Sequence, residues 1–199
     1  MTPKSAVAAE ADPADAAVQA HEDEKEAAKL VAAAAALVKK GDPGLPAFFD
    51  LFYRNAAPDD ITRYSAEALA ALAQSVFKRC SLRKRGESYV ELFSPRDENK
   101  AYGRNEMVLA AINDDMPFLF DSLIAEMSSH GARVRAVFHP VIALGEAQNG
   151  KPVKESVIAL VIDPVDEARR HAIVEGARAV FAQVHVAVRD WHAMQAHLL

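Results

Sequence analysis

The sequence has 199 residues, of which 51% are hydrophobic, so it can form one ordinary domain with an appendage rather than two full cores. Its formal net charge of −5 argues against a nucleic-acid partner, because nucleic-acid-binding domains usually carry a strongly basic surface. The single cysteine, Cys80, excludes an internal disulfide framework and fits a reducing compartment, so we expect a cytoplasmic protein.

The N-terminal quarter of the chain predicts a leader followed by a helical arm. Residues 1–25 contain almost no large apolar side chains, so we expect them to be disordered, and their acidic character fits no targeting signal. Alanine-rich residues 26–40 predict the first helix of an arm that spans residues 26–95. The apolar run within it is too short to cross a membrane, so we expect no membrane partner.

The rest of the arm should hold two more helices and one extra strand. The first of these two helices contains Phe48, Phe49 and Phe52, which we interpret as a core or interdomain contact in preference to a ligand pocket. Ser65 is the predicted N-cap of a second helix that ends near residue 78. Residues 89–93 predict the strand. Between them lies a basic cluster that we interpret as a solvated turn, in preference to a phosphate site: Lys78, Arg79, Arg83, Lys84 and Arg85.

Residues 106–190 predict an α+β domain, a ferredoxin-like βαββαβ two-layer sandwich. Residues 107–112 and 157–162 are apolar at every position, which is typical of central strands. Pro140 favours an edge position for the second strand, and alternating valines at residues 184–188 predict the fourth strand. Asp163 and Pro164 are expected to begin the second helix, and residues 191–199 to form a tail.

The two helices of such a domain cover only one face of its sheet. Both central strands are nevertheless apolar on both faces, so something must cover the second face. The sequence leaves two alternatives open: the helices between residues 45 and 80, or another domain or subunit.

Three segments carry a resemblance to a known family. Residues 112–122 read INDDMPFLFDS, residues 139–141 read HPV, and residues 188–191 read VRDW, with Met194 following. From about residue 49 to the C-terminus, the chain resembles the N-terminal region of the large bacterial NAD-dependent glutamate dehydrogenases. The resemblance implies an ACT-like regulatory domain, whose parent enzyme converts L-glutamate and NAD to 2-oxoglutarate, ammonium and NADH.

The same resemblance places the chemistry elsewhere in the parent enzyme. The sequence contains no Gly-x-Gly-x-x-Gly fingerprint, so we expect NAD to bind in the parent enzyme and no cofactor to bind in this chain. We also expect no catalytic residue and no metal site, because His185, His192 and His197 match no standard ligand spacing. For His139 we expect a structural or interface role.

The resemblance also implies a candidate effector site. ACT domains commonly bind an amino acid at the turn between their first strand and first helix, which here comprises Asn113, Asp114, Asp115, Met116, Pro117, Phe118 and Leu119. Phe118 stands where the family pattern expects a glycine, which argues against close approach of a ligand. The unpaired N–H groups of a helix start favour an anion, whereas Asp114 and Asp115 oppose one and are expected to serve as caps.

These observations lead to one principal hypothesis and two alternatives. The principal hypothesis is a regulatory and assembly module that docks on other domains or subunits of a glutamate dehydrogenase. One alternative is a sensor domain that binds an amino-acid effector at residues 113–119. The other is a stand-alone interaction protein or a truncated gene product.

Overall fold

The computed structural model describes residues 13–38, 42–143 and 154–198, with the side chains of residues 13–16 and 191–198 left aside. Four helices come first, namely α1 (Pro13–Leu37), α2 (Leu45–Tyr53), α3 (Pro58–Thr62) and α4 (Ala66–Leu82). Strand β1 (Tyr89–Phe93), the short helix α5 (Pro95–Glu98) and a 3₁₀ turn (Lys100–Tyr102) follow. The remainder consists of β2 (Met107–Asp114), α6 (Leu119–Ser129), β3 (Val134–Phe138), β4 (Val141–Ile142), β5 (Glu155–Ile162) and α7 (Glu167–Leu198).

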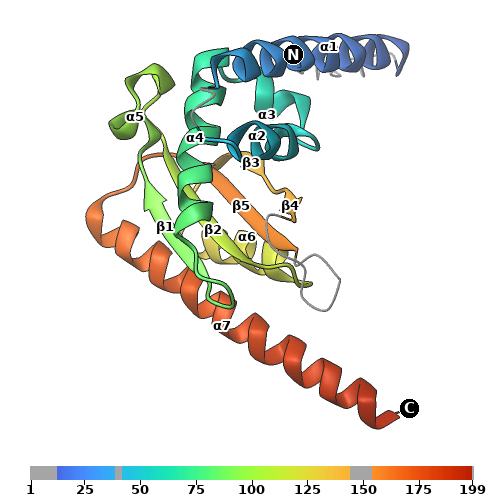
Figure 1. Ribbon diagram of the computed structural model, residues 1–199, viewed down its shortest axis with the longest axis vertical. Coiled ribbons are helices and arrows are strands. Elements are labelled where there is room, and N and C mark those ends of the chain that lie inside the picture. The colour runs from blue at the N-terminus through green and yellow to red at the C-terminus, as the bar shows by residue number, and fades with distance from the viewer. Residues whose placement is uncertain (1–12, 39–41, 144–153, 199) are drawn as a thin grey trace, which may run out of the picture.

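One antiparallel sheet organises these elements, with strand order β1-β2-β5-β3 and the short β4 also paired to β5. The predicted central strands are confirmed, because β2 and β5 pair in the middle, and β3 lies at an edge as Pro140 indicated. Helices lie on both sides of the sheet, with α2 and α4 on one side and α6 and α7 on the other (Figure 1). The predicted two-layer sandwich is therefore wrong, since the arm adds a third layer.

The predicted fourth strand is also wrong. Residues 184–188 lie inside α7, so the order of elements is not βαββαβ, and β1 pairs with β2 at the edge where the fourth strand was expected. Alternating valines also suit a helix here, because Val184 continues a buried stripe formed by Ile173, Ala177 and Phe181. Val186 points away from this stripe and is 48% exposed. Residues 191–198 continue the same helix rather than forming a separate tail.

Two local predictions at helix starts have different outcomes. The cap at Ser65 is confirmed, since its Oγ accepts a hydrogen bond from the Ala68 N–H at 3.2 Å. The predicted start at Asp163 and Pro164 is wrong, because Asp163 pairs with Arg135 and α7 begins only at Glu167. The nearby Asp166 accepts a hydrogen bond from the Arg169 N–H at 2.8 Å.

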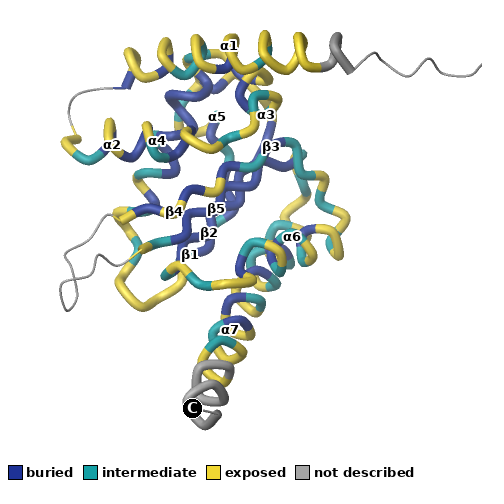
Figure 2. Tube along the Cα trace, turned by 90° about the vertical axis from the view of Figure 1, so that its right-hand side faces the viewer, coloured by how far each residue is buried: buried dark blue, intermediate teal, exposed yellow. Residues whose placement is uncertain are grey.

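The N-terminal prediction needs one correction. Helix α1 begins at Pro13, so residues 13–25 are helical rather than disordered, whereas residues 1–12 lie outside the described residues. Most of the helix is exposed, but Ala27, Ala34 and Val38 are buried on one side, against the helices below (Figure 2). Small residues at this spacing allow α1 to pack closely against the neighbouring helices. The charged residues in the first half of α1 made this pattern hard to recognise in the sequence.

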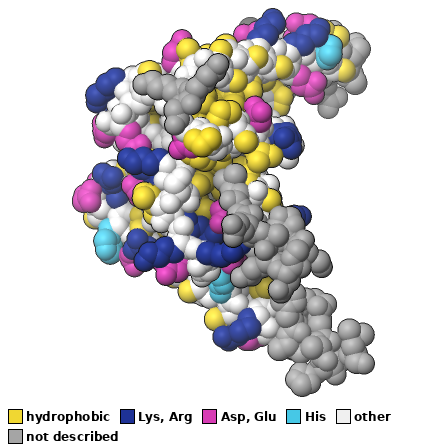
Figure 3. Space-filling view, in the orientation of Figure 1, with side chains coloured by type: hydrophobic (Ala, Val, Ile, Leu, Met, Phe, Trp, Pro, Cys, Tyr) yellow, Lys and Arg dark blue, Asp and Glu magenta, His cyan; other side chains and the backbone are white. Residues whose placement is uncertain are grey.

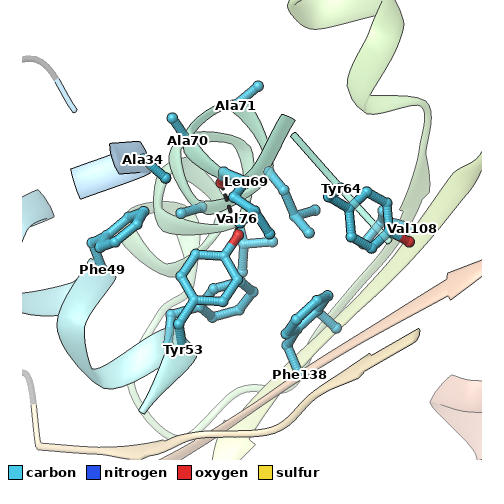
Figure 4. Close-up of a cluster of buried hydrophobic side chains, with 14 of the residues drawn as sticks. Ala34, Phe49, Tyr53, Tyr64, Leu69, Ala70, Ala71, Val76, Val108 and Phe138 are labelled. Carbon is cyan, nitrogen blue, oxygen red and sulfur yellow. Dashed lines mark hydrogen bonds between the residues drawn. The ribbon is translucent and has the colours of Figure 1, made fainter. Parts of the chain in front are cut away.

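The sheet face that the sequence left open is covered by the chain itself. Arm residues Phe48, Phe49 and Phe52 are each at most 1% exposed, and they pack with Val108, Ile112 and other side chains of the sheet. Phe138 of β3 meets the rings of Phe52 and Tyr53 at centroid distances of 5.3 and 5.4 Å. Figure 4 shows this cluster, including the hydrogen bond from the Tyr53 hydroxyl to the Leu69 carbonyl at 2.7 Å. The arm is thus part of the core, as the phenylalanines predicted.

Two arginines of the basic cluster also fasten the arm to the sheet. Arg79 is 3% exposed, its guanidinium lies 3.2 Å from the Phe93 ring centroid, and it pairs with Glu91 at 3.0 Å and Glu98 at 2.8 Å. Arg83 has a side chain only 1% exposed. The predicted solvated turn is therefore wrong for both residues. Sequence reasoning missed this because their carboxylate partners are distant in the chain.

Candidate functional site

A row of polar side chains crosses one end of the sheet, on the face that α6 and α7 cover. Asn113 of β2 and Ser156 of β5 lie directly opposite each other in the register, and each is 1% exposed. Cross-strand partners point to the same face, and the residues that precede Asn113 alternate so that Leu109 and Ala111 share its side. Two otherwise apolar strands therefore place a polar side chain at the same level of the sheet.

Asn113 lies at the centre of this row and has one unused hydrogen-bonding group. Its Oδ1 accepts hydrogen bonds from Ser88 Oγ at 3.0 Å and from His185 Nε2 of α7 at 3.1 Å. In this arrangement both neighbours donate to the amide oxygen, which requires His185 to carry its proton on Nε2. The Nδ2 amide is buried and has no partner among the described atoms. A buried donor without a partner costs about 1–3 kcal/mol, so an acceptor placed here would stabilise the fold.

His139 occupies the other half of the row. Its Nε2 is 2.8 Å from Ser156 Oγ, and its ring stacks on Phe120 of α6 with centroids 5.0 Å apart. Partial burial lowers the pKa of His139, although the carboxylates of Asp115 and Asp121 act in the opposite direction. With a pKa below 6.5, the imidazole is mostly neutral at pH 7, and it donates to Ser156 Oγ or accepts from it according to its tautomer.

The turn into α6 holds an unusual backbone conformation at Phe118. Its φ of 69° is the one positive φ of a non-glycine residue in the described chain, and its side chain is 66% exposed. A left-handed conformation costs an ordinary residue about 1–2 kcal/mol. The backbone here adopts the conformation that a glycine would provide, although the sequence has a phenylalanine. Such strain is retained where surrounding structure imposes it, and it is frequent at ligand-binding turns.

The seven predicted site residues do not all converge. Only Asn113 lies in the buried row, while Pro117 and Phe118 are exposed in the turn. Leu119 is 2% exposed and belongs to the core, and Met116 packs at the edge of the same cluster. Whether any of them contacts a ligand remains a prediction.

The two aspartates have roles other than the predicted caps. Asp114 lies on the opposite face of β2, where its Oδ1 is 2.5 Å from Arg83 Nη2, so its charge is neutralised away from the turn. Arg83 also pairs with Glu155. Asp115 is exposed, and its N–H donates to the Lys154 carbonyl at 2.9 Å. Of the two aspartates, only Asp115 therefore has a negative charge that opposes binding of an anion at the turn.

Sequence reasoning missed three members of the row: Ser88, Ser156 and His185. One signal was available, because a polar residue ends the first apolar run at Asn113 and another begins the second at Ser156. In an antiparallel pair of strands, these two positions must coincide. His185 could not be placed, since residues 184–188 were interpreted as a strand.

The described residues offer little for covalent or metal chemistry. Burial raises the pKa of the Cys80 thiol to about 12, which disfavours a reactive thiolate. Within the described ranges, no three His, Cys, Asp or Glu side chains form a group that could hold a metal ion. No described helix is both long enough and apolar enough to cross a membrane.

A separate hollow of about 430 Å³ lies under α1. It is lined mainly by alanines of α1 and by Val31, Tyr53 and Ile61, and Figure 3 shows hydrophobic side chains gathered there. Glu24, Asp50 and Arg54 also line it, so charged groups accompany the apolar surface.

Comparisons with known proteins show which sequences this chain resembles. The family model described as "Glutamate dehydrogenase, ACT1 domain" matches residues 48–177. The NAD-specific glutamate dehydrogenase of Halomonas elongata is 25% identical over 163 residues, which cover 75% of this chain and 10% of that protein. The NAD-specific glutamate dehydrogenase of Pseudomonas aeruginosa is 24% identical over 173 residues, 78% of this chain and 11% of that protein. The chain spans about a tenth of the length of these relatives.

Proposed function

The chain belongs to the glutamate dehydrogenase ACT1 domain family, and from this premise we propose that it is a regulatory and assembly module of a large NAD-dependent glutamate dehydrogenase. In this proposal the parent enzyme oxidises L-glutamate to 2-oxoglutarate and ammonium and reduces NAD. The module performs no step of that reaction. It responds to an amino-acid effector and contacts other domains or subunits of the enzyme.

The unpartnered amide of Asn113 is the observation that carries the regulatory part. An amino-acid carboxylate offers the acceptor that Nδ2 lacks, and the first N–H groups of the eleven-residue helix α6 favour the same negative charge. Arg83 removes one objection to this arrangement, because it neutralises Asp114 on the other face of the strand. Asp115 and the neutral His139 are then available for the amino group of the effector.

Binding should be tested by thermal unfolding of the full chain with a panel of amino acids. A ligand that binds only the folded state raises the melting temperature in proportion to its occupancy. We expect at least one amino acid to raise it, and we expect Asn113→Asp to abolish the shift, because this variant keeps the shape but replaces the donor by a negative charge. Asn105→Asp is the matched control, since Asn105 is exposed and remote from the row.

Two outcomes would contradict the sensor role. One is the absence of a shift with every amino acid, and the other is an equal shift in Asn113→Asp and the parent chain. If Asn113→Asp fails to fold, Asn113→Ser provides the same comparison without a new charge.

The assembly part rests on a different observation. Described elements of the chain cover both faces of the sheet, so an open sheet face does not support docking. Helix α7, however, extends well beyond the sheet (Figure 1). Where it still packs on the sheet, its outward side carries an apolar strip with Ala182, Val186 and Ala187. An exposed apolar helix face is suited to packing against another domain.

Analytical ultracentrifugation of the chain, alone and with the dehydrogenase chain from the same organism, tests this contact. We expect association that Val186→Asp weakens and Val141→Asp leaves nearly intact, since Val141 is a comparably exposed valine on β4. A chain that stays monomeric and does not associate with the dehydrogenase would remove the assembly role.

A further inference from the structure

The row of polar side chains that contains Asn113 continues across the sheet to an apolar end. In the register, Asn113 of β2 lies opposite Ser156 of β5, and Ser156 also lies opposite Val141 of β4. Cross-strand partners point to the same face of a sheet, so these three side chains form one line. Ile142, the next residue of β4, is accordingly buried in the core cluster on the other face.

The two ends of this row differ in their access to solvent. Asn113 and Ser156 are each 1% exposed, whereas Val141 is 43% exposed. At the buried end, Ser88 and His185 both contact the Asn113 amide. The row is therefore closed beside Asn113 and open at Val141.

Two stacked rings lie beside the open end. The Nε2 of His139, two residues before Val141, is 2.8 Å from Ser156 Oγ. Phe120 lies in the first turn of α6, and its ring stacks on the His139 imidazole with an interplanar angle of 13°. Phe120 is only partly buried and packs against the core cluster beneath α6. These contacts connect the start of α6, where the proposed function places a carboxylate, to the open end of the row.

The spacing of the strands sets the length of a ligand that fits the row. Neighbouring strands lie about 4.8 Å apart, so the backbones at Asn113 and Val141 are roughly 10 Å apart across β5. A carboxylate bound to Asn113 Nδ2 therefore leaves a distance of several carbon–carbon bonds before the ligand reaches Val141. Glycine and alanine are too short to reach it, whereas an amino acid with a branched aliphatic or aromatic side chain is long enough.

The chemistry of the open end favours an apolar side chain. Asp115 and Asp121 both act on the His139 imidazole and oppose the lowering of its pKa, so the charge near this end is negative and opposes a second carboxylate on the ligand. A basic side chain would be attracted by these carboxylates. It would, however, place a strongly hydrated group against the apolar surface of Val141 and Phe120.

We propose that the effector is an amino acid with a long apolar side chain, which lies along the row from Asn113 to Val141. This inference rests on the proposed function, because it concerns the same site. The carboxylate accepts a hydrogen bond from Asn113 Nδ2, and the side chain covers Val141 and the edge of the Phe120 ring. One methylene group in an apolar site changes affinity by about tenfold or more, so this contact is sufficient for selection. The module then responds to an amino acid other than glutamate, the substrate of the proposed parent reaction.

The test is isothermal titration calorimetry of the full chain with leucine, phenylalanine, alanine, glutamate and lysine. Val141→Lys places a positive charge at the open end, and the exposure of Val141 allows the variant to fold. Leu37→Lys is the matched control, because Leu37 is 46% exposed and belongs to the arm helix α1. Val141→Thr keeps the shape of the side chain without a charge, and it replaces Val141→Lys if that variant does not fold.

Leucine or phenylalanine should bind at least about tenfold more tightly than alanine, glutamate and lysine. Val141→Lys should weaken this binding by about tenfold and reduce the preference over glutamate, whereas Leu37→Lys should bind as the parent chain does. A preference of the parent chain for alanine, glutamate or lysine, or an unchanged preference in Val141→Lys, would overturn this inference and leave the sensor role intact. The absence of binding by every amino acid would overturn both.

Discussion

The middle of the sheet and its two ends are built from different chemistry. In the middle, β2 and β5 pair through residues that are fully buried and apolar on both faces. At the ends, Asn113 and Ser156 belong to these strands, and Glu106 and Asp163 lie directly before β2 and after β5. Unpartnered donors lie at Asn113 and Tyr64. Burial of apolar side chains stabilises the fold, whereas burial of a polar group costs free energy unless the group has a hydrogen-bond partner. The middle therefore provides stability, and one of the ends carries the polar groups on which the proposed effector site rests.

The largest effect is expected from a substitution in the middle. Phe138→Ala removes a side chain that is fully buried among Phe52, Tyr53 and Tyr64. The resulting cavity should lower the free energy of unfolding by about 3–5 kcal/mol, as measured by urea denaturation. The exposed Phe118→Ala serves as the control. A loss below about 1 kcal/mol would show that the arm does not share the core of the sheet.

A smaller loss of stability is expected from substitution of Arg79, the buried arginine between the arm and the sheet. Arg79→Ala removes the ion pairs to Glu91 and Glu98 together with the contact on Phe93, and we expect a loss of about 2–3 kcal/mol. Both carboxylates are partly exposed and can regain water, which limits the loss. Arg79→Met keeps most of the apolar packing and should recover about half of it. If both variants lose equally, the charge matters more than the packing.

A gain of stability is expected at the strained turn. Phe118→Gly removes the cost of a left-handed phenylalanine but increases the entropy of the unfolded chain, so the net gain should be about 0.5–1 kcal/mol. Phe118→Ala keeps a Cβ and therefore the strain, so it should show no comparable gain. Urea denaturation of the two variants separates these effects. A loss of stability in Phe118→Gly would mean that the exposed ring contributes contacts of its own.

The sequence could predict the middle of the molecule better than its ends. Runs of apolar residues located β2 and β5, and the phenylalanines of α2 identified the core contact, because burial leaves a direct mark on composition. The role of Arg79 could not be predicted, since its carboxylate partners Glu91 and Glu98 are met only after folding. The strand predicted at residues 184–188 failed for a related reason, because β1 already occupies the edge beside β2 and tertiary pairing overrides local preference.

The sequence could predict which segment of the chain holds the candidate site, but not which other residues the fold brings to it. Family resemblance indicated the turn at residues 113–119, and Asn113 does lie in the buried polar row. The glycine that the family pattern expects at position 118 was also informative, because Phe118 adopts the backbone conformation that a glycine would favour. Ser88 and His185 come from segments more than 20 residues before and 70 after Asn113, and nothing in their local sequence connects them to it.

The smallest effect is expected from protonation of His139, at the polar end of the sheet. Because its folded pKa lies below the ordinary value of 6.5, the unfolded chain binds more protons between the two values, and stability must rise with pH in that window. The contribution is complete above about pH 6.5 and is lost as the pH falls through that value. Asp115 and Asp121 reduce the shift, and His139 is exposed to solvent, so the loss should be small.

Urea denaturation between pH 5 and 8 measures this loss, with His139→Gln as the comparison, since glutamine can still hydrogen-bond Ser156 but does not titrate. The carboxylates whose pKa is lowered, Glu67, Glu98 and Asp163, titrate below their ordinary values of 4.5, 4.5 and 3.8, so they leave the upper part of the curve unchanged. We expect the variant to have a flatter profile near pH 6. Parallel profiles would mean that His139 is solvated, and the polar end of the sheet would then be more open than its hydrogen bonds indicate.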